Sequence, residues 1–407
     1  MIRPRPKPSP IARPRPHPQK IMDVGKPADF PPIGRTLSAY PNRQYRRTAP
    51  ELPKQPRFNR RKIIKRTLLV LLIIILLVGG WVGWKFYQNA TKAFGGSIWG
   101  IFHSTKLKGE DVGRVNILLA GNSADDPGHG GANLTDSIMI ISLDTKNNTS
   151  FMLSIPRDLW VDIPGYGHQK INATYEDGQD EHFSQAGYAS GGMGLLEQVV
   201  SQNFDIPINY YALIDYTAFR DAVNAVGGIT VNIQSSNPNG LYDPDTDYTT
   251  GGVLVNLSNG QHTLNGQEAL DLARARGDAY GSYGFAGSDF TRQQDQQLML
   301  VALKNKAFSA GVLSNPIKLG NLFNSIGNNV KTDFTLSYVR RLYDLSHKVT
   351  NSSTKSVSLN SVNGKDLLQS YTAYDGESAL IPAAGLDDYS AIQAYVDTLT
   401  AVQTTSK

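Results

Sequence analysis

An uncharged, apolar run of 18 residues at positions 67–84 is the feature that most limits how this chain can fold. A helix rises about 1.5 Å per residue, so a run of this length is just able to cross the hydrocarbon core of a membrane. Basic side chains crowd the preceding segment, 60–66, and aromatic residues lie at the far end, at Trp81, Trp84 and Tyr87. Because 66 residues precede the run, a cleaved signal peptide is excluded. The positive-inside bias predicts a single-pass protein of the cell membrane, with a cytoplasmic amino terminus and an extracytoplasmic carboxyl-terminal domain.

Charge is divided unevenly along the chain. Residues 1–66 hold 18 of the 40 Lys and Arg residues, 3 of the 35 Asp and Glu residues and 14 of the 22 prolines. We therefore predict a disordered, partly polyproline-II tail over 1–59, with docking of a partner as the alternative role. The basic flank and membrane helix follow at 60–87, and a stalk at 88–111. The rest of the chain is acidic, which argues against a nucleic-acid surface on its folded part.

Alternating strand and helix patterns indicate an α/β domain over 112–397, followed by a short tail at 398–407. Buried strands are predicted at 115–121, 137–143, 151–155, 210–215 and 229–233, and helices at 194–200, 217–226, 266–276 and about 290–310. This order predicts a mixed central sheet flanked by helices on both faces. The stretch from about 311 onward, with apolar periodicity at 336–349, is expected to complete the fold.

Charged residues stand where two of the predicted strands end. Arg157 follows the apolar strand at 151–155, and strand ends are common positions for site residues in α/β sheets. The loop 121–136 is rich in Gly and acid and is too long for a hairpin turn, so it is a candidate binding loop. Asp136 at its end is able to hold a hard cation through oxygen. A solvated surface loop is the alternative interpretation.

A second set of polar residues lies on the later helices. Arg274 and Arg276 are two positions apart, so they bind one ligand only if the helix ends there, with Gly277 supplying the break. Arg292 and Gln296 are four apart and share a helix face, which is also common for ordinary solvated pairs. Asp289 is predicted to cap this helix.

Several guanidinium groups with one carboxylate suit phosphate chemistry. Guanidinium groups bind phosphate oxygens in pairs, and Mg²⁺ spreads the charge that builds during phosphoryl transfer. There is no cysteine, and the seven His residues lack metal-ligand spacing. An exported, membrane-tethered site has no ATP, so the phosphate donor is expected to be a lipid diphosphate.

The order and spacing of these segments resemble the LytR–CpsA–Psr (LCP) family of cell-wall glycopolymer ligases, over most of the predicted exported domain. The segments that carry the resemblance are 116–119, 135–139, 153–158, 170–173, 226–231, 264–270, 273–276 and 289–292. The resemblance implies transfer of a glycopolymer from polyprenyl diphosphate to a peptidoglycan hydroxyl, with Mg²⁺ as the cofactor. It also implies an apolar interior that takes the prenyl tail.

The roles of individual residues come from the same resemblance. The residues implied to bind the diphosphate are Arg157, Arg274, Arg276, Arg292 and Gln296. Asp136 and Arg157 are implied to be catalytic, with Asp136 holding Mg²⁺ or helping to activate the hydroxyl.

Three positions depart from the family pattern. Ser123 stands where an acid is usual, Leu134 where an Arg is usual, and Asp295 where the last helix usually has its second Arg. Asp125 or Asp126 is a candidate replacement ligand for the metal. These departures motivate an alternative function as a non-catalytic polyprenyl-lipid-binding scaffold or regulator of the envelope. A lipid pyrophosphatase is a further alternative.

Overall fold

The computed structural model describes residues 104–125, 132–244, 254–287, 289–312, 322, 326–327, 329–362 and 364–401. The predicted tail, membrane helix and most of the stalk lie outside these residues, as does Asp126. Among the helices of the described ranges, none combines the length and the apolar character that crossing a membrane requires.

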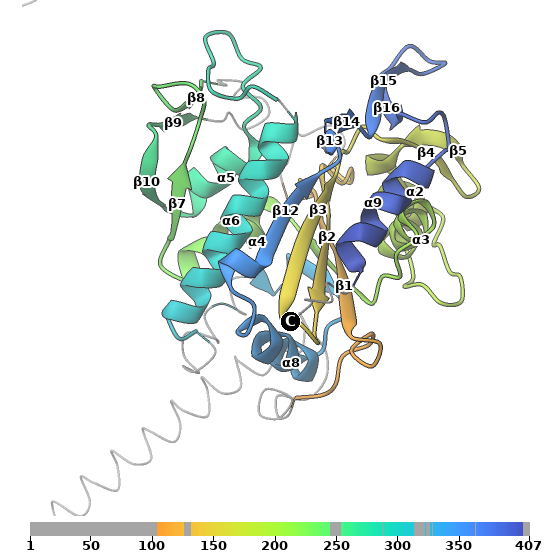
Figure 1. Cartoon of the computed structure of the whole chain (residues 1–407), viewed down its shortest axis with the longest axis horizontal. Coiled ribbons are helices and arrows are strands. Elements are labelled where there is room, and N and C mark those ends of the chain that lie inside the picture. The colour runs from red at the N-terminus through yellow and green to blue at the C-terminus, as the bar shows by residue number, and fades with distance from the viewer. Residues whose placement is uncertain are drawn as a thin grey trace, which may run out of the picture. The chain divides into compact units, whose positions relative to one another are not determined.

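A six-stranded mixed sheet forms the centre of the described region (Figure 1). Its strands, in spatial order, are β11 (Val330–Thr332), β6 (Tyr210–Ile214), β1 (Arg114–Gly121), β2 (Ser137–Asp144), β3 (Thr149–Ile155) and β12 (Thr354–Ser358). The β1–β6 and β3–β12 pairs are parallel and the other pairs are antiparallel. The outermost strands, β11 and β12, both come from the stretch after residue 311, which confirms that this stretch completes the fold.

Helices lie on both faces of the sheet. Side chains alternate along each strand, so that each face of the sheet has apolar residues for a helix to pack against. Leu118 and Ile140 point into a core shared with α3 (Gly192–Phe204) and α9 (Ser390–Thr400). Val115 and Ile117 point the other way and pack with α8 (Leu336–Ser346). The predicted mixed α/β fold, with its sheet between helices, is confirmed.

A separate apolar core joins three more helices to two small sheets. The helices are α4 (Tyr216–Ala225), α5 (Gly266–Arg274) and α6 (Asp289–Ser309), and the strand pairs are β7 (Ile229–Ile233) with β10 (Gly260–Leu264) and β8 (Leu241–Asp243) with β9 (Val255–Leu257). The predicted strand at 229–233 therefore exists but lies outside the central sheet.

Shorter elements complete the described region. They are β4 (Trp160–Ile163) with β5 (Gly167–Lys170), β13 (Ser361–Val362) with β14 (Lys365–Asp366), β15 (Leu368–Thr372) with β16 (Ser378–Pro382), α2 (Thr174–Asp180), and the 3₁₀ turns η2 (Ile171–Ala173) and η3 (Asn351–Ser353).

Local capping explains where α4 and α5 begin and where α4 ends. Asp215 accepts a hydrogen bond from the Ala218 amide at 2.7 Å and so caps the start of α4. Asn265 and Glu268 form a capping box at the start of α5. The predicted stop after residue 226 is confirmed, since Gly227 and Gly228 both have positive φ.

Asp295 is a buried acid in this second part of the fold. It is 9% exposed, and its Oδ2 atom has no hydrogen-bond partner among the described residues. Burial raises the pKa of Asp295 to about 7. A carboxyl whose pKa is raised by folding stabilises the fold at low pH and loses that contribution as the pH rises through its folded pKa.

We therefore expect Asp295→Asn to flatten the pH dependence of stability. Between pH 5 and pH 8 the wild-type free energy of unfolding should fall relative to the variant by roughly 2–3 kcal/mol, because only the wild type must ionise the side chain at position 295. Urea unfolding of the detergent-solubilised full-length protein at several pH values measures this difference. Asp366→Asn, at an exposed position on β14, is the control. Parallel wild-type and Asp295→Asn curves would contradict the prediction.

Candidate active site

A cavity of about 280 Å³ lies between the central sheet and helices α4, α5 and α6. Its inner wall is apolar, with Leu119, Met139 and Ile214 from the sheet facing Leu270 and Met299 from the helices. Five of the predicted site residues also line it: Asp136, Arg274, Arg276, Arg292 and Gln296. Residues from three distant segments therefore converge on one cavity, whose lining combines these polar side chains with apolar ones.

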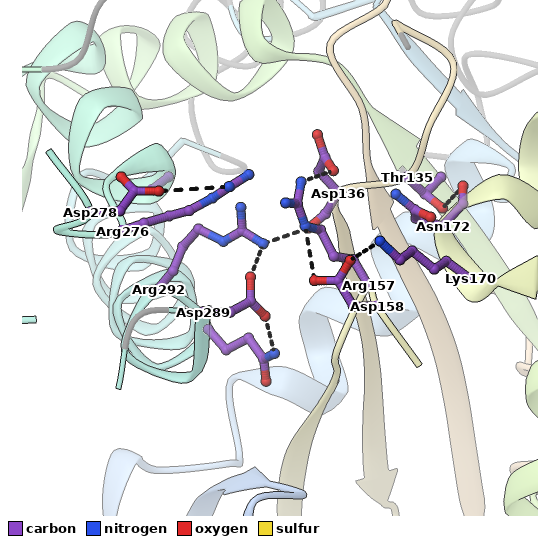
Figure 2. A network of polar contacts seen from close by, with 12 residues as sticks. Thr135, Asp136, Arg157, Asp158, Lys170, Asn172, Arg276, Asp278, Asp289 and Arg292 are labelled. Atoms are coloured by element: carbon purple, nitrogen blue, oxygen red, sulfur yellow. Dashed lines mark hydrogen bonds and ion pairs between the residues drawn. The ribbon is translucent and has the colours of Figure 1, made fainter. Parts of the chain in front are cut away.

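Arg157, the sixth predicted residue, is tied to this cavity through Asp136. Asp136 directly precedes β2 and Arg157 follows β3, so the antiparallel pairing of these strands brings the two side chains together. Arg157 Nη1 donates to Asp136 Oδ1 at 2.6 Å, and Arg157 Nε lies 3.6 Å from Asp158 Oδ2 (Figure 2). Burial opposes the charge on Arg157, but the Asp136 and Asp158 carboxylates outweigh it and raise its pKa.

Arg292 reaches the same centre from the first turn of α6. Its side chain is 6% exposed, it is paired with Asp289, and its Nη2 donates to the Asp136 backbone oxygen at 3.2 Å (Figure 2). Burial lowers the pKa of Arg292 and the Asp289 carboxylate opposes that shift, yet an Arg stays protonated in proteins. The predicted capping role of Asp289 is wrong: α6 already includes Asp289, and its carboxylate binds the Arg292 and Gln293 side chains instead.

The end of α5 separates its two arginines in the predicted way. The helix ends at Arg274, and Gly277 has a φ of +72°, so the chain turns directly after Arg276. The Arg274 guanidinium lies over the Tyr216 ring, 4.8 Å from its centroid. Arg276 points towards Arg292, with Asp278 4.0 Å from its guanidinium (Figure 2).

Gln296 has a structural contact in addition to its place at the cavity. Its Nε2 atom donates to the Ala273 backbone oxygen at 3.0 Å, which ties α6 to the last turn of α5. This hydrogen bond fixes the spacing between the helix that carries Arg292 and the segment that carries Arg274 and Arg276.

Sequence reasoning missed several polar neighbours of the site. Lys170 lies 3.4 Å from Asp158 and 3.0 Å from Glu377, which extends the charged network to the β15–β16 hairpin. Asp243 lines the cavity from β8 and is 1% exposed. Lys170 belongs to a segment that carried the family resemblance, whereas no local pattern distinguishes Asp243.

The carboxylates near the cavity do not form a metal cage made of protein alone. Asp125 oxygens accept the Tyr216 and Thr217 amides, at 3.2 and 2.7 Å, so this carboxylate caps α4. The described residues contain no group of three His, Asp or Glu placed to hold a metal ion. Mg²⁺ is commonly held by one or two carboxylates together with substrate phosphates and water. Asp136 therefore fits a cation that enters with a diphosphate.

Comparison with known proteins identifies the family of this chain. The LytR_cpsA_psr family model matches residues 88–383. The chain belongs to the LytR–CpsA–Psr family. This match covers more than half of the chain and includes every predicted site residue.

Curated relatives share about a third of the aligned residues. The chain is 33% identical over 229 residues to the polyisoprenyl-teichoic acid–peptidoglycan teichoic acid transferase TagU of Oceanobacillus iheyensis, covering 56% of this chain and 61% of TagU. It is 30% identical over 220 residues to the regulatory protein MsrR of Staphylococcus aureus, covering 54% of this chain and 57% of MsrR. The chain thus spans about three fifths of the length of these relatives.

A solved structure has the same fold. The structure described as TagT bound to LIIa-WTA superposes with a TM-score of 0.50 at 25% identity, covering 70% of this chain and 90% of that one. The mixed sheet and its helices are therefore an LCP fold.

The position of Asp125 predicts the effect of removing it. Asp125→Ala should lower the free energy of unfolding by about 1 kcal/mol, because it removes an acceptor from the first amides of α4. Urea unfolding of the full-length protein measures this loss, and Asp366→Asn again serves as the control. An unchanged stability accompanied by a loss of Mg²⁺ binding would show that Asp125 is a metal ligand and not a cap.

Proposed function

We propose that this protein is a membrane-anchored phosphotransferase that moves a glycopolymer from a polyprenyl diphosphate carrier to a peptidoglycan hydroxyl. The observation that carries the proposal is the convergence of Asp136, Arg276 and Arg292 on one cavity with a partly apolar lining, together with Arg157, which donates to Asp136 beside it. The name of the TagU relative, a teichoic acid transferase to peptidoglycan, supports the same reaction class.

The charged part of the cavity lining suits a diphosphate. Guanidinium groups bind phosphate oxygens in pairs, and their attraction is stronger where water is excluded, as it is around the buried Arg292. Arg276, from just after α5, lies beside Arg292, and both side chains point towards Arg157 (Figure 2). Three cations from separate elements therefore surround one volume, which matches a head group that carries several negative charges.

The apolar part of the cavity lining suits the prenyl tail. Leu119, Met139 and Met299 are part of its lining and carry no charge. Burial of a CH₂ group contributes about 0.8 kcal/mol relative to water, which is comparable to what the bilayer already provides. The lipid is thus able to move between the membrane and the cavity without a large cost.

The proposed reaction makes use of this placement. The acceptor hydroxyl attacks the sugar-linked phosphorus, the bond to the bridging oxygen breaks, and polyprenyl phosphate leaves. Arg157 and Arg292 stabilise the charge on the phosphoryl oxygens, and Asp136 lies beside both groups, positioned to take the hydroxyl proton or to hold the cation. Mg²⁺, when bound through Asp136, would supply further neutralisation of the diphosphate.

Two residues favour an alternative in which the protein binds the lipid without turnover and acts as an envelope scaffold or regulator. The buried Ser123 and the partly buried Leu134 replace charged residues of the family pattern, and the MsrR relative is named a regulatory protein. Hydrolysis of the lipid diphosphate, with water as acceptor, is the third outcome to test.

One assay separates these functions. The full-length protein in nanodiscs receives a short polyprenyl-diphosphate oligosaccharide, a peptidoglycan oligomer and Mg²⁺, and both polyprenyl phosphate and linked sugar are quantified. Ligation yields the two products in equal amounts. Polyprenyl phosphate without linkage indicates hydrolysis, and binding of the lipid without any product indicates the scaffold.

Loss of the central guanidinium should abolish turnover. We expect Arg157→Ala to reduce kcat by about 100-fold or more, as removal of one preorganised charge-stabilising donor does in other enzymes. The circular dichroism spectrum and thermal unfolding show whether the fold is retained. Arg340→Ala, which removes an Arg–Asp pair on α8, is the matched control and should retain full activity. Equal activity of Arg157→Ala and wild type would refute the site assignment.

The metal proposal has its own test. Asp136→Asn should weaken the dependence of activity on Mg²⁺ concentration, because it removes the cavity-lining carboxylate that is proposed to hold the ion. Isothermal titration of Mg²⁺ into the protein loaded with prenyl diphosphate gives a readout that is independent of turnover. If both measurements match those of the wild type, Asp136 does not hold the ion.

A further inference from the structure

A buried carboxylate holds the segment that carries Arg276. Asp243, the last residue of β8, is 1% exposed. Its Oδ2 atom accepts the Arg276 amide at 3.2 Å and the Gly277 amide at 2.8 Å, and its Oδ1 atom accepts the Ser282 hydroxyl at 3.2 Å. All three donors belong to the loop between α5 and α6. Because a buried charge is costly without partners, these hydrogen bonds couple the position of the loop to that of β8.

The same loop is joined to β8 by its backbone. Tyr242 and Tyr283 exchange two backbone hydrogen bonds, at 3.0 and 2.9 Å, and their rings stack with centroids 5.3 Å apart. Gly277 keeps its positive φ in a confined place, where an added Cβ would lie 2.4 Å from the Phe285 side chain. The chain direction just after Arg276 is therefore fixed from both sides.

Arg276 needs this support because its guanidinium group has weak restraints of its own. Its side chain is 33% exposed, and Asp278, its ion-pair partner, is 4.0 Å away and 63% exposed. The Arg276 charge also disfavours the charged form of Arg292, so the two cations repel each other. Repulsion and solvent access would move a flexible Arg276 away from the cavity.

We propose that Asp243 is a positioning residue for Arg276. Its carboxylate holds the amides of Arg276 and Gly277, and thereby presents the Arg276 guanidinium to an anionic diphosphate head group. The inference rests on the proposed function, because the benefit arises only when such a head group binds in the cavity. Although Asp243 also lines the cavity, both of its carboxylate oxygens accept hydrogen bonds from the loop, so its proposed action on the head group runs through the loop.

The test uses a double-mutant cycle on the full-length protein in detergent. Isothermal titration with geranylgeranyl diphosphate compares wild type, Asp243→Asn, Arg276→Ala and the double variant. Asn has the size of Asp but offers one acceptor oxygen and no charge, so it weakens the hold on the two amides. We expect each single variant to raise Kd by about 10-fold, and the double variant to bind no more weakly than Arg276→Ala alone.

Hydrogen exchange and a matched control exclude a merely structural effect. Exchange of the Gly277 amide should accelerate in Asp243→Asn. The control is Asp144→Asn: Asp144 is 5% exposed and its carboxylate also accepts two turn amides, from Lys146 and Asn147, but it lies outside the cavity lining. This control should leave the Kd for geranylgeranyl diphosphate unchanged.

The outcomes distinguish this inference from the function beneath it. If wild type binds the diphosphate and Asp243→Asn weakens binding by the same factor in both backgrounds, the positioning role is overturned while the proposed function stands. Unchanged binding in Asp243→Asn, with faster exchange at Gly277, also overturns the role. If wild type fails to bind geranylgeranyl diphosphate at all, both the proposed function and this inference are overturned.

Discussion

The contact between Arg157 and Asp136 is the interaction around which the candidate site is arranged. Strand pairing alone puts the two residues at neighbouring strand ends. The 2.6 Å hydrogen bond then fixes the Arg157 guanidinium where β2 begins and β3 ends. Arg292 binds the backbone of the same aspartate, so α6 is anchored to the point where β2 begins. The sheet and the helix that enclose the cavity are therefore joined at Asp136.

This anchoring explains how a charged centre and an apolar cavity coexist. Burial of a guanidinium is tolerable only with a carboxylate close by, and here Asp136, Asp158 and Asp289 supply that compensation. The charges are consequently satisfied at one end of the cavity, and the strand alternation that buries Leu118 on one face leaves Leu119 on the other, facing the cavity. A cavity lined by both charged and apolar side chains follows from this combination of strand-end ion pairs and period-2 patterning.

Much of this arrangement could be predicted from sequence, and the exceptions have physical causes. The central strands and the end of α5 are local features, encoded in apolar runs and in Gly277, so they were accessible. The role of Asp243 was not, because it depends on a β8 strand of three residues meeting a loop 33 positions later in the chain. Asp289 failed as a predicted cap for a related reason: its carboxylate had two competing side-chain donors whose geometry only the folded helix reveals.

The altered loop before β2 shows how the same fold distributes its acids differently. Where the family pattern has an acid, this chain has the fully buried Ser123, and the nearby Asp125 faces the amides of α4. An acid two residues further along is thus engaged at a helix start, which a negative charge stabilises. In the described part of the loop, Asp136 is then the carboxylate that lines the cavity, and it already compensates Arg157. The negative charge of a bound head group would therefore be neutralised mainly by guanidinium groups. The placement of Arg276 and Arg292 is then more important than in a site with two metal-binding acids.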